Sequence, residues 1–196
     1  MFCAIKGYDL ILIMPDNMSL ERRAAMLAYG AEIILVTEKQ GMEGARDLAI
    51  EMQEENKGLV LNQFANNDNV EAHYKTTGPE IWKDTKGKVT HFVASMGTTG
   101  TIVGTAKYLK SMNPKIKIIG VQPEEGASIP GIRKWPKEYV PKIFSDKNID
   151  EIIYISQDQA ENTARNLAKK EGIFSGPSSG GTTFVALEIA KKEKNA

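Results

Sequence analysis

Apolar and polar residues follow one another along the first third of the chain in a pattern that predicts strands followed by helices. An apolar strand is expected from Tyr8 to Met14, and a helix with apolar residues three or four positions apart follows the N-cap residue Ser19. A second strand, Glu32 to Val36, and a second helix after Gly41 repeat this order. The short apolar run 59–61 predicts one more strand.

The rest of the chain continues this order after the polar stretch 65–69, which marks the expected domain boundary. A helical region interrupted at Gly78-Pro79 is expected from Val70 to Trp82. Further strands are predicted at 90–95, 116–122, 152–155 and 173–174, with helices at 102–110 and after the capping box of Ser156 and Gln159. Such alternation is typical of parallel strands joined by right-handed helical crossovers. Residues 123–150 carry several prolines and no apolar periodicity, so we expect a long surface loop there.

The composition is that of a folded protein without a preference for charged polymers. The 196 residues are 41% hydrophobic and 26% charged, and 25 basic residues balance 25 acidic ones, so no basic field attracts nucleic acid or an anionic membrane. No apolar run approaches the roughly 20 residues of a membrane helix, and we expect a cytoplasmic protein. Cys3, His73 and His91 lie too far apart in sequence to indicate a metal site, and we expect them to be structural.

The strongest candidate for chemistry is the loop Gly97-Thr98-Thr99-Gly100-Thr101, which follows an apolar strand and precedes a helix. A phosphate needs several donors that converge on one point, and backbone amides at a helix N-terminus supply them. The glycines allow close approach, and the threonines add hydroxyl donors. No lysine follows Gly100, which argues against a nucleotide triphosphate loop. A glycine-rich turn without a ligand remains the alternative.

Two other patterns stay open from the residues alone. Gly97, Gly100 and Gly104, with Glu124 after the next strand, loosely resemble a Rossmann dinucleotide turn, although the usual Gly-x-Gly start is missing. Near the C-terminus, Ser178 and Ser179 open a helix at a glycine-flanked turn, where simple N-capping explains them.

Five motifs follow one another along almost the whole chain. They are Met14-Pro15-Asp16-Asn17-Met18-Ser19, Gly78-Pro79-Glu80-Ile81-Trp82, Ser95-Met96-Gly97-Thr98-Thr99-Gly100-Thr101, Gln122-Pro123-Glu124 and Ser178-Ser179-Gly180. Taken together they closely resemble the cysteine synthase (O-acetylserine sulfhydrylase) family, within the tryptophan-synthase-β-like group of pyridoxal 5′-phosphate enzymes. The segment Ser128 to Pro136 resembles the B type of the family more than the A type.

This resemblance implies an α/β fold of type II for pyridoxal-phosphate enzymes. That fold is a three-layer α-β-α architecture with two lobes, each around a mainly parallel sheet. Residues 1–62 would be part of the smaller lobe, and residues 63–196 would be the larger cofactor-binding lobe without its C-terminal end, so we expect both lobes to be incomplete. Members of the family form homodimers.

The resemblance also assigns roles to residues. The loop Gly97 to Thr101 would hold the phosphate of pyridoxal 5′-phosphate, and Ser178 would place its hydroxyl against the pyridine nitrogen, which a neutral partner leaves largely unprotonated. Gln63 matches a glutamine near the substrate carboxylate, and Arg133 belongs to a mobile segment where it would contact an anion. From the residues alone, a strand-end position for Gln63 and a solvated basic patch at Arg133 remain alternatives.

The implied reaction is a β-replacement, in which O-acetylserine and sulfide give cysteine, or thiosulfate gives S-sulfocysteine. In the family, the Schiff-base lysine and a Ser-Gly-Asn-Thr-Gly loop both precede the segment matched by Ala4 to Tyr8, so no catalytic residue is expected in this chain. We therefore expect the chain to be inactive alone. The alternatives are a non-catalytic truncated product and a Rossmann-like domain that binds a nucleotide cofactor.

Overall fold

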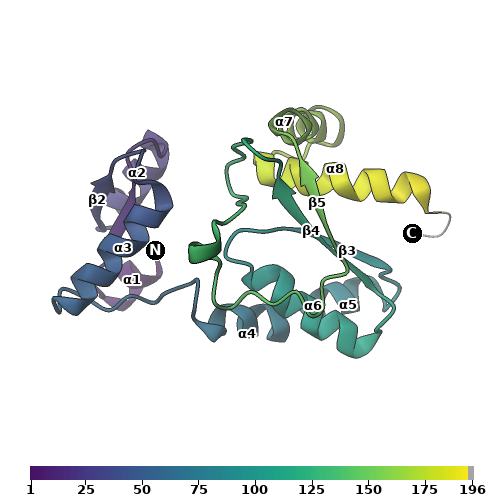
Figure 1. Ribbon diagram of the computed structural model, residues 1–196, viewed down its shortest axis with the longest axis horizontal. Helices are drawn as coiled ribbons and strands as arrows, with labels where there is room; N and C mark the ends of the chain where they lie inside the picture. Colours follow the sequence, from purple (N-terminus) through teal and green to yellow (C-terminus); the bar gives the residue numbers. More distant parts are fainter. Residues whose placement is uncertain (194–196) are drawn as a thin grey trace. The chain divides into compact units, whose positions relative to one another are not determined.

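The computed structural model describes residues 1–193 and divides the chain into two compact units, Met1–Leu61 and Asn62–Ala196, here called the N-terminal and C-terminal units (Figure 1). Each unit combines helices with strands that pair in parallel. The α/β class expected from the sequence is therefore confirmed. Whether the two units correspond to the smaller and larger lobes of the implied fold, divided at residue 62, stays a prediction.

The N-terminal unit is built on two parallel strands, β1 (Ile11–Pro15) and β2 (Glu32–Val36). Between them lies α2 (Leu20–Ala28), and its N-cap is Ser19, whose hydroxyl accepts a hydrogen bond from the backbone N–H of Arg22 at 3.4 Å. The helix α3 (Gly41–Glu54) follows β2 and packs on β1, while the short α1 (Phe2–Lys6) precedes β1.

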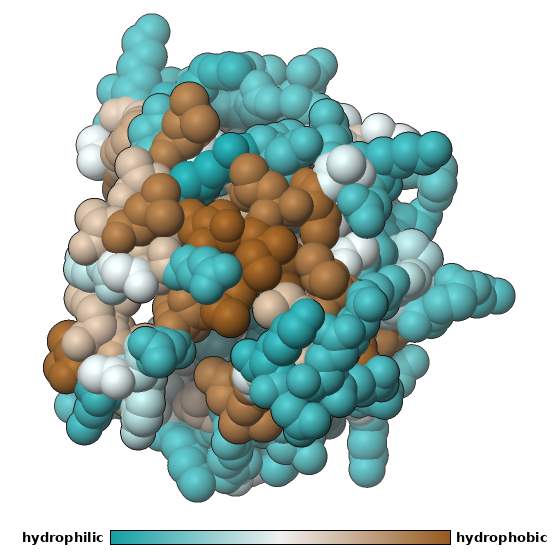
Figure 2. Space-filling view, turned by 90° about the vertical axis from the view of Figure 1, so that its left-hand side faces the viewer, coloured by the Kyte–Doolittle hydropathy of each residue, from teal (hydrophilic) through white to brown (hydrophobic). Residues whose placement is uncertain are grey.

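Hydrophobic side chains gather on the face of the N-terminal unit that is turned to the viewer in Figure 2. Large apolar residues of this unit that remain exposed include Ile5, Tyr8, Ile11 and Leu35. Contiguous apolar surface of this kind favours association with another surface.

The C-terminal unit contains a three-stranded parallel sheet in the order β3-β4-β5. The strands are β3 (His91–Ser95), β4 (Lys117–Pro123) and β5 (Glu151–Ile155). Figure 1 shows helices on both faces of this sheet. On one face lie α4 (Asn67–Lys75), α5 (Thr77–Asp84) and α6 (Gly100–Met112); on the other lie α7 (Gln157–Asn166), with the π-helical turn η2 (Leu167–Glu171), and α8 (Pro177–Lys192).

The buried side chains form one cluster on each side of this sheet. The first packs Ile102 and Leu109 of α6 against Ile118 of β4. The second joins Val121 of β4 and Val185 of α8 with isoleucines of the loop that follows β4. The sheet therefore has apolar contacts on both faces, as expected for parallel strands.

Residues 124–150 form the long excursion that the prolines predict, with a single turn of 3₁₀ helix, η1 (Lys137–Tyr139). The excursion is anchored rather than loose, because Ile129, Ile132 and Ile143 are buried. Two of these isoleucines belong to the second apolar cluster.

Several predicted boundaries are wrong. The runs 59–61 and 173–174 are not strands: Leu59 is 82% exposed and Phe174 is 96% exposed, and neither run pairs with a strand in the described part of the chain. The first strand begins at Ile11 rather than Tyr8, because the N–H of Tyr8 instead bonds back to Cys3 and ends α1. The predicted interruption of the helical region occurs, but at Thr76, between α4 and α5. Gly78-Pro79 lies in the first turn of α5, where a proline needs no intrahelical partner.

Candidate functional site

The loop Gly97–Thr101 connects the carboxyl end of β3 to the first turn of α6. The N–H of Met96, just before the loop, still bonds to Val121 of β4, so the sheet fixes where the loop begins. The first N–H groups of α6 have no partner within the helix, and no acidic residue lies in its first turn. The loop therefore offers hydrogen-bond donors and the positive end of a helix dipole without a competing negative charge.

Thr99 is the most unusual residue of the loop. Its backbone has φ of 73°, in the left-handed region that β-branched residues rarely adopt. The residue is only 4% exposed, and its hydroxyl oxygen has no hydrogen-bond partner among the described residues. Strained backbone and an unsatisfied buried hydroxyl each cost free energy, and they commonly occur together at ligand sites.

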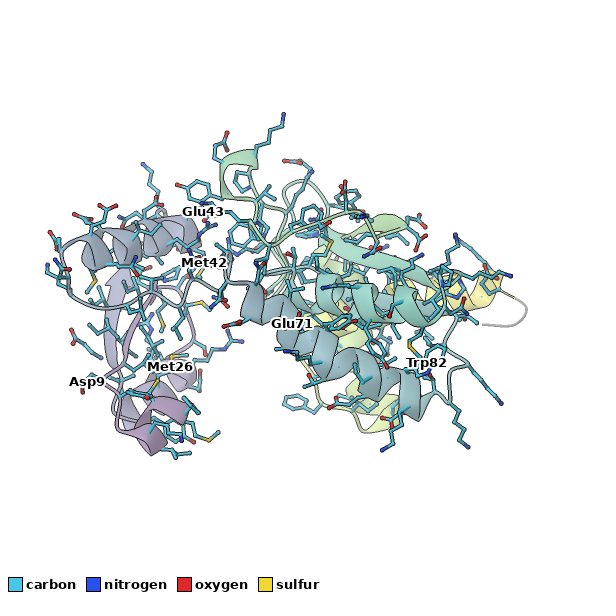
Figure 3. The ribbon with its side chains drawn as sticks, turned by 90° about the horizontal axis from the view of Figure 1, so that it is seen from below. Asp9, Met26, Met42, Glu43, Glu71 and Trp82 are labelled. Carbon is cyan, nitrogen blue, oxygen red and sulfur yellow. The ribbon has the colours of Figure 1, made fainter. Side chains whose placement is uncertain are left out.

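The helix α4, marked by Glu71 in Figure 3, supports the loop from one side. Asn69 Nδ2 donates to the hydroxyl oxygen of Thr98 at 3.1 Å. His73 Nε2 lies 3.1 Å from the hydroxyl oxygen of Thr101, and its Nδ1 lies 2.9 Å from that of Thr77. Burial lowers the pKa of His73, which favours the neutral form of its imidazole.

The segment 129–135 supports the loop from another side. The indole N–H of Trp135 donates to the carbonyl oxygen of Gly97 at 2.8 Å, and the backbone N–H of Arg133 donates to Met96 at 2.9 Å. Gly131 adopts a left-handed φ of 92°, and a Cβ atom there would lie 3.0 Å from the hydroxyl oxygen of Ser178. Only a glycine at this position lets the segment approach Ser178 without a shift.

Ser178 lies in the first turn of α8, but it is not the cap of that helix. The N-cap is Gly176 and the first helical residue is Pro177. The N-capping explanation offered by the sequence is therefore wrong for Ser178 and Ser179, because the helix begins before both of them. The half-buried Ser178 side chain is instead adjacent to Gly131.

Gln63 and Arg133, the expected substrate contacts, lie on segments that meet at Trp135. The ring of Phe64, next to Gln63, makes an edge contact with Trp135 at 5.2 Å between ring centroids. The guanidinium of Arg133 lies over the same indole at 5.3 Å. Gln63 is exposed, and its backbone carbonyl accepts a hydrogen bond of 2.8 Å from Asn69.

The structure thus brings all the candidate residues together within the C-terminal unit, through a continuous series of contacts. Those residues are Gln63, Gly97, Thr98, Thr99, Gly100, Thr101, Arg133 and Ser178. Sequence reasoning missed the supporting residues Asn69 and Gly131 and assigned His73 only a structural place. The signal for Asn69 was the polar stretch 65–69, which was interpreted as a boundary.

The third glycine of the Rossmann-like spacing has a packing role. A Cβ atom on Gly104 would lie 2.2 Å from the carbonyl oxygen of Val70, so this glycine allows α6 to cross α4 closely. Glu124 donates its backbone N–H to Ile155 of β5. The place of Gly104 in this spacing is therefore explained by helix packing, without a dinucleotide.

No helix within residues 1–193 is long and apolar enough to cross a membrane. In the same range, no group of three or more His, Cys, Asp and Glu side chains could hold a metal ion.

The whole chain is similar in sequence to known pyridoxal-phosphate dependent enzymes. The family model "Pyridoxal-phosphate dependent enzyme" matches residues 1–196. Cysteine synthase B of Pseudomonas aeruginosa is 58% identical over 196 residues, covering 100% of this chain and 66% of that protein. Cysteine synthase B of Escherichia coli is 59% identical, again over 100% of this chain and 65% of that protein. The chain therefore spans 65–66% of the length of these curated relatives.

The fold agrees with this similarity. The crystal structure of cysteine synthase from Entamoeba histolytica superposes with a TM-score of 0.88 at 41% sequence identity, covering 98% of this chain and 60% of that one.

Proposed function

Because the chain belongs to the family of pyridoxal-phosphate dependent enzymes, we propose that its C-terminal unit binds pyridoxal 5′-phosphate (PLP) and serves the β-replacement reaction of a B-type cysteine synthase. In this reaction sulfide replaces the acetate of O-acetylserine to give cysteine, or thiosulfate replaces it to give S-sulfocysteine. The observation that carries the proposal is the buried, unpartnered hydroxyl of strained Thr99 at the start of α6.

The residues present fit the phosphate of PLP. A phosphate dianion accepts hydrogen bonds and donates none when fully ionised, and the loop Gly97–Thr101 offers backbone N–H groups and threonine hydroxyls. A bound phosphate would give the Thr99 hydroxyl a partner. The charge of the phosphate would also be stabilised by the N-terminal end of the 13-residue helix α6.

When bound, PLP supplies an electron-withdrawing ring that stabilises negative charge on the substrate carbon next to the amino group. Ser178 would hold the pyridine nitrogen with a neutral hydroxyl. A hydroxyl does not stabilise a protonated nitrogen as a carboxylate does, so the ring withdraws electrons less strongly. That suits loss of acetate better than a long-lived carbanion.

Gln63 and Arg133 would recognise the substrates. The amide of Gln63 can donate a hydrogen bond to a carboxylate without adding charge to the site. Arg133, whose guanidinium lies over Trp135, would contact an anionic sulfur donor such as thiosulfate, and a planar guanidinium matches such an anion well. The choice between sulfide and thiosulfate would then depend on Arg133.

We also propose that the 196-residue chain does not complete the reaction by itself. A lysine that bonds to the cofactor must be desolvated and next to its aldehyde carbon. Every lysine in the described range 1–193 is exposed except the half-buried Lys110, whose ammonium pairs with Asp150 at 2.8 Å. A homodimer and a cytoplasmic location, which the sequence predicts, remain proposals.

The substitution Thr99→Val tests the cofactor assignment, because it keeps the shape of the side chain and removes the hydroxyl. PLP binding, followed by absorbance titration, should weaken about tenfold or more, since hydrogen bonds to charged groups are the strong ones. The thermal midpoint of the PLP-free chain should rise, because the buried hydroxyl has no partner. These two effects have opposite signs, which a general folding defect would not produce.

Thr90→Val, at an exposed threonine just before β3, is the matched control. Its hydroxyl lies 3.0 Å from His91 Nδ1, so this variant should leave PLP affinity unchanged and should not raise the thermal midpoint. Unchanged PLP affinity in Thr99→Val would contradict the assignment of the loop. Thermal protection by NAD but not by PLP would favour the nucleotide alternative. Formation of cysteine from O-acetylserine and sulfide by the 196-residue chain with PLP would contradict the proposed inactivity.

A further inference from the structure

The side chain of Asn69 joins two segments that the sequence places far apart. Its Nδ2 atom donates to the backbone carbonyl of Gln63 at 2.8 Å and to the hydroxyl oxygen of Thr98 at 3.1 Å. Both hydrogens of one amide group are thereby used. One side chain of α4 thus holds both the Gln63 backbone and the loop Gly97–Thr101, here called the phosphate loop.

The orientation of this amide follows from its partners. A backbone carbonyl can only accept a hydrogen bond, so the nitrogen of Asn69, and not its oxygen, must face Gln63. The amide oxygen then lies against the start of α6. A Cβ atom on Gly100 would be 2.0 Å from Asn69 Oδ1, so the glycine is what allows this close contact.

This arrangement decides what the hydroxyl of Thr98 can do. A hydroxyl has one hydrogen to donate and two lone pairs that accept. The Thr98 oxygen accepts from Asn69 and, at 3.4 Å, from the backbone N–H of Gly100. With both lone pairs engaged, the hydroxyl hydrogen must point to a third group.

Building on the PLP function proposed above, we propose that Asn69 is a positioning residue that makes Thr98 an obligatory hydrogen-bond donor to the cofactor phosphate. A phosphate oxygen accepts this hydrogen, whereas a ligand that presents a donor there finds no acceptor. The same amide fixes the backbone at Gln63, so the phosphate loop and the substrate side of the site share one support.

The test compares Asn69→Asp with Asn67→Asp. In Asn69→Asp, a carboxylate replaces the donor, accepts the Thr98 hydrogen and places a negative charge beside the phosphate. Asn67→Asp makes the same change at the exposed first residue of α4 and serves as the control. Binding of inorganic phosphate, PLP and pyridoxal, which lacks the phosphate, is measured by calorimetry for each chain.

We expect Asn69→Asp to weaken the binding of phosphate and of PLP at least tenfold, to change pyridoxal binding less than twofold, and Asn67→Asp to change all three less than twofold. Equal phosphate affinity in Asn69→Asp and the unaltered chain would overturn the inference. A parallel loss for pyridoxal would also overturn it, because it would show a structural role only. Failure of the unaltered chain to bind phosphate and PLP would overturn the proposed function together with this inference.

A second set of variants decides the question if Asn69→Asp does not fold. Asn69→Ala and Thr98→Val remove the same hydrogen bond from its two ends. The double variant should therefore bind phosphate no more weakly than Thr98→Val alone. If the losses in phosphate affinity of the two single variants add in full in the double variant, Asn69 acts independently of Thr98, and the inference is overturned.

Discussion

Gly104 controls how closely α6 approaches α4, the helix that supports the loop Gly97–Thr101. A Cβ atom on Gly104 would lie 2.2 Å from the carbonyl oxygen of Val70, 2.8 Å from the Cβ of His73 and 3.1 Å from the backbone nitrogen of Tyr74. Two of these three atoms belong to the backbone of α4, so a side-chain rotation cannot relieve the overlap. The substitution Gly104→Ala therefore forces α4 to move away from α6.

Two opposing effects determine how Gly104→Ala changes the free energy of unfolding. Alanine favours the helical conformation over glycine by about 1 kcal/mol. Overpacking costs about 1–3 kcal/mol, and a shift of α4 also weakens its hydrogen bonds to Thr98 and Thr101, worth about 1 kcal/mol each. The overlap outweighs the helix propensity, and we expect Gly104→Ala to lower the free energy of unfolding by about 2–4 kcal/mol.

Thermal unfolding followed by circular dichroism measures this effect. For a chain of this length, a loss of about 2–4 kcal/mol lowers the midpoint by roughly 4–16 °C. Gly58→Ala is the control, because no atom lies within 4 Å of a Cβ built there, and its midpoint should stay close to that of the unaltered chain. A midpoint for Gly104→Ala that rises, as helix propensity alone predicts, would refute the reasoning.

Two other predictions concern local contacts. Burial raises the pKa of Asp150, but hydrogen bonds from Lys110 and from the backbone N–H of Ile118, with the lysine charges, lower the pKa overall. The ionised Asp150 carboxylate therefore contributes its full stabilisation of the folded chain above about pH 4. This contribution is lost as the pH falls through the lowered folded-state pKa, so Asp150→Asn should not show this loss of stability in an acid titration. Ser156→Ala removes the capping box of α7 and should cost about 1 kcal/mol in chemical denaturation, while Ser156→Asp keeps a capping oxygen and should not.

Each of these two predictions has a clear contrary outcome. If Asp150→Asn loses stability in acid as steeply as the unaltered chain, the ion pair with Lys110 does not account for the acid sensitivity. If Ser156→Ala and Ser156→Asp unfold at the same denaturant concentration, the cap contributes nothing measurable.

The strands that pair in the structure are well predicted by the sequence, because each contains a run of apolar residues with turn residues at its ends. The strand Glu32–Val36 was predicted with its observed bounds, and the three strands of the C-terminal unit within one residue at either end. The runs 59–61 and 173–174 have the same apolar character, but a strand also needs a neighbour to pair with. That requirement depends on tertiary structure, and two or three residues do not reveal it.

The candidate site also has one part that the sequence predicts and one part that it does not. The loop Gly97–Thr101 is a local feature, so its glycines and threonines could be identified from their spacing. The support from α4 is not local, since Asn69 and His73 lie 29 and 28 residues before their partners Thr98 and Thr101. Polar residues on a helix usually face solvent, and only the close crossing at Gly104 brings these two to the loop.

The hydroxyls of the loop show why the residue pattern alone left its ligand open. Thr98 and Thr99 are neighbours with identical side chains, yet Thr98 accepts two hydrogen bonds while Thr99 has no partner in the described structure. A turn that only joined a strand to a helix would gain nothing from an unsatisfied buried hydroxyl on a strained backbone. Both hydroxyls still have a hydrogen without an acceptor, and one anion that accepts from both would supply it. The phosphate assignment therefore depends on which hydrogen bonds the loop leaves open, and this is set by helix α4 as much as by the loop itself.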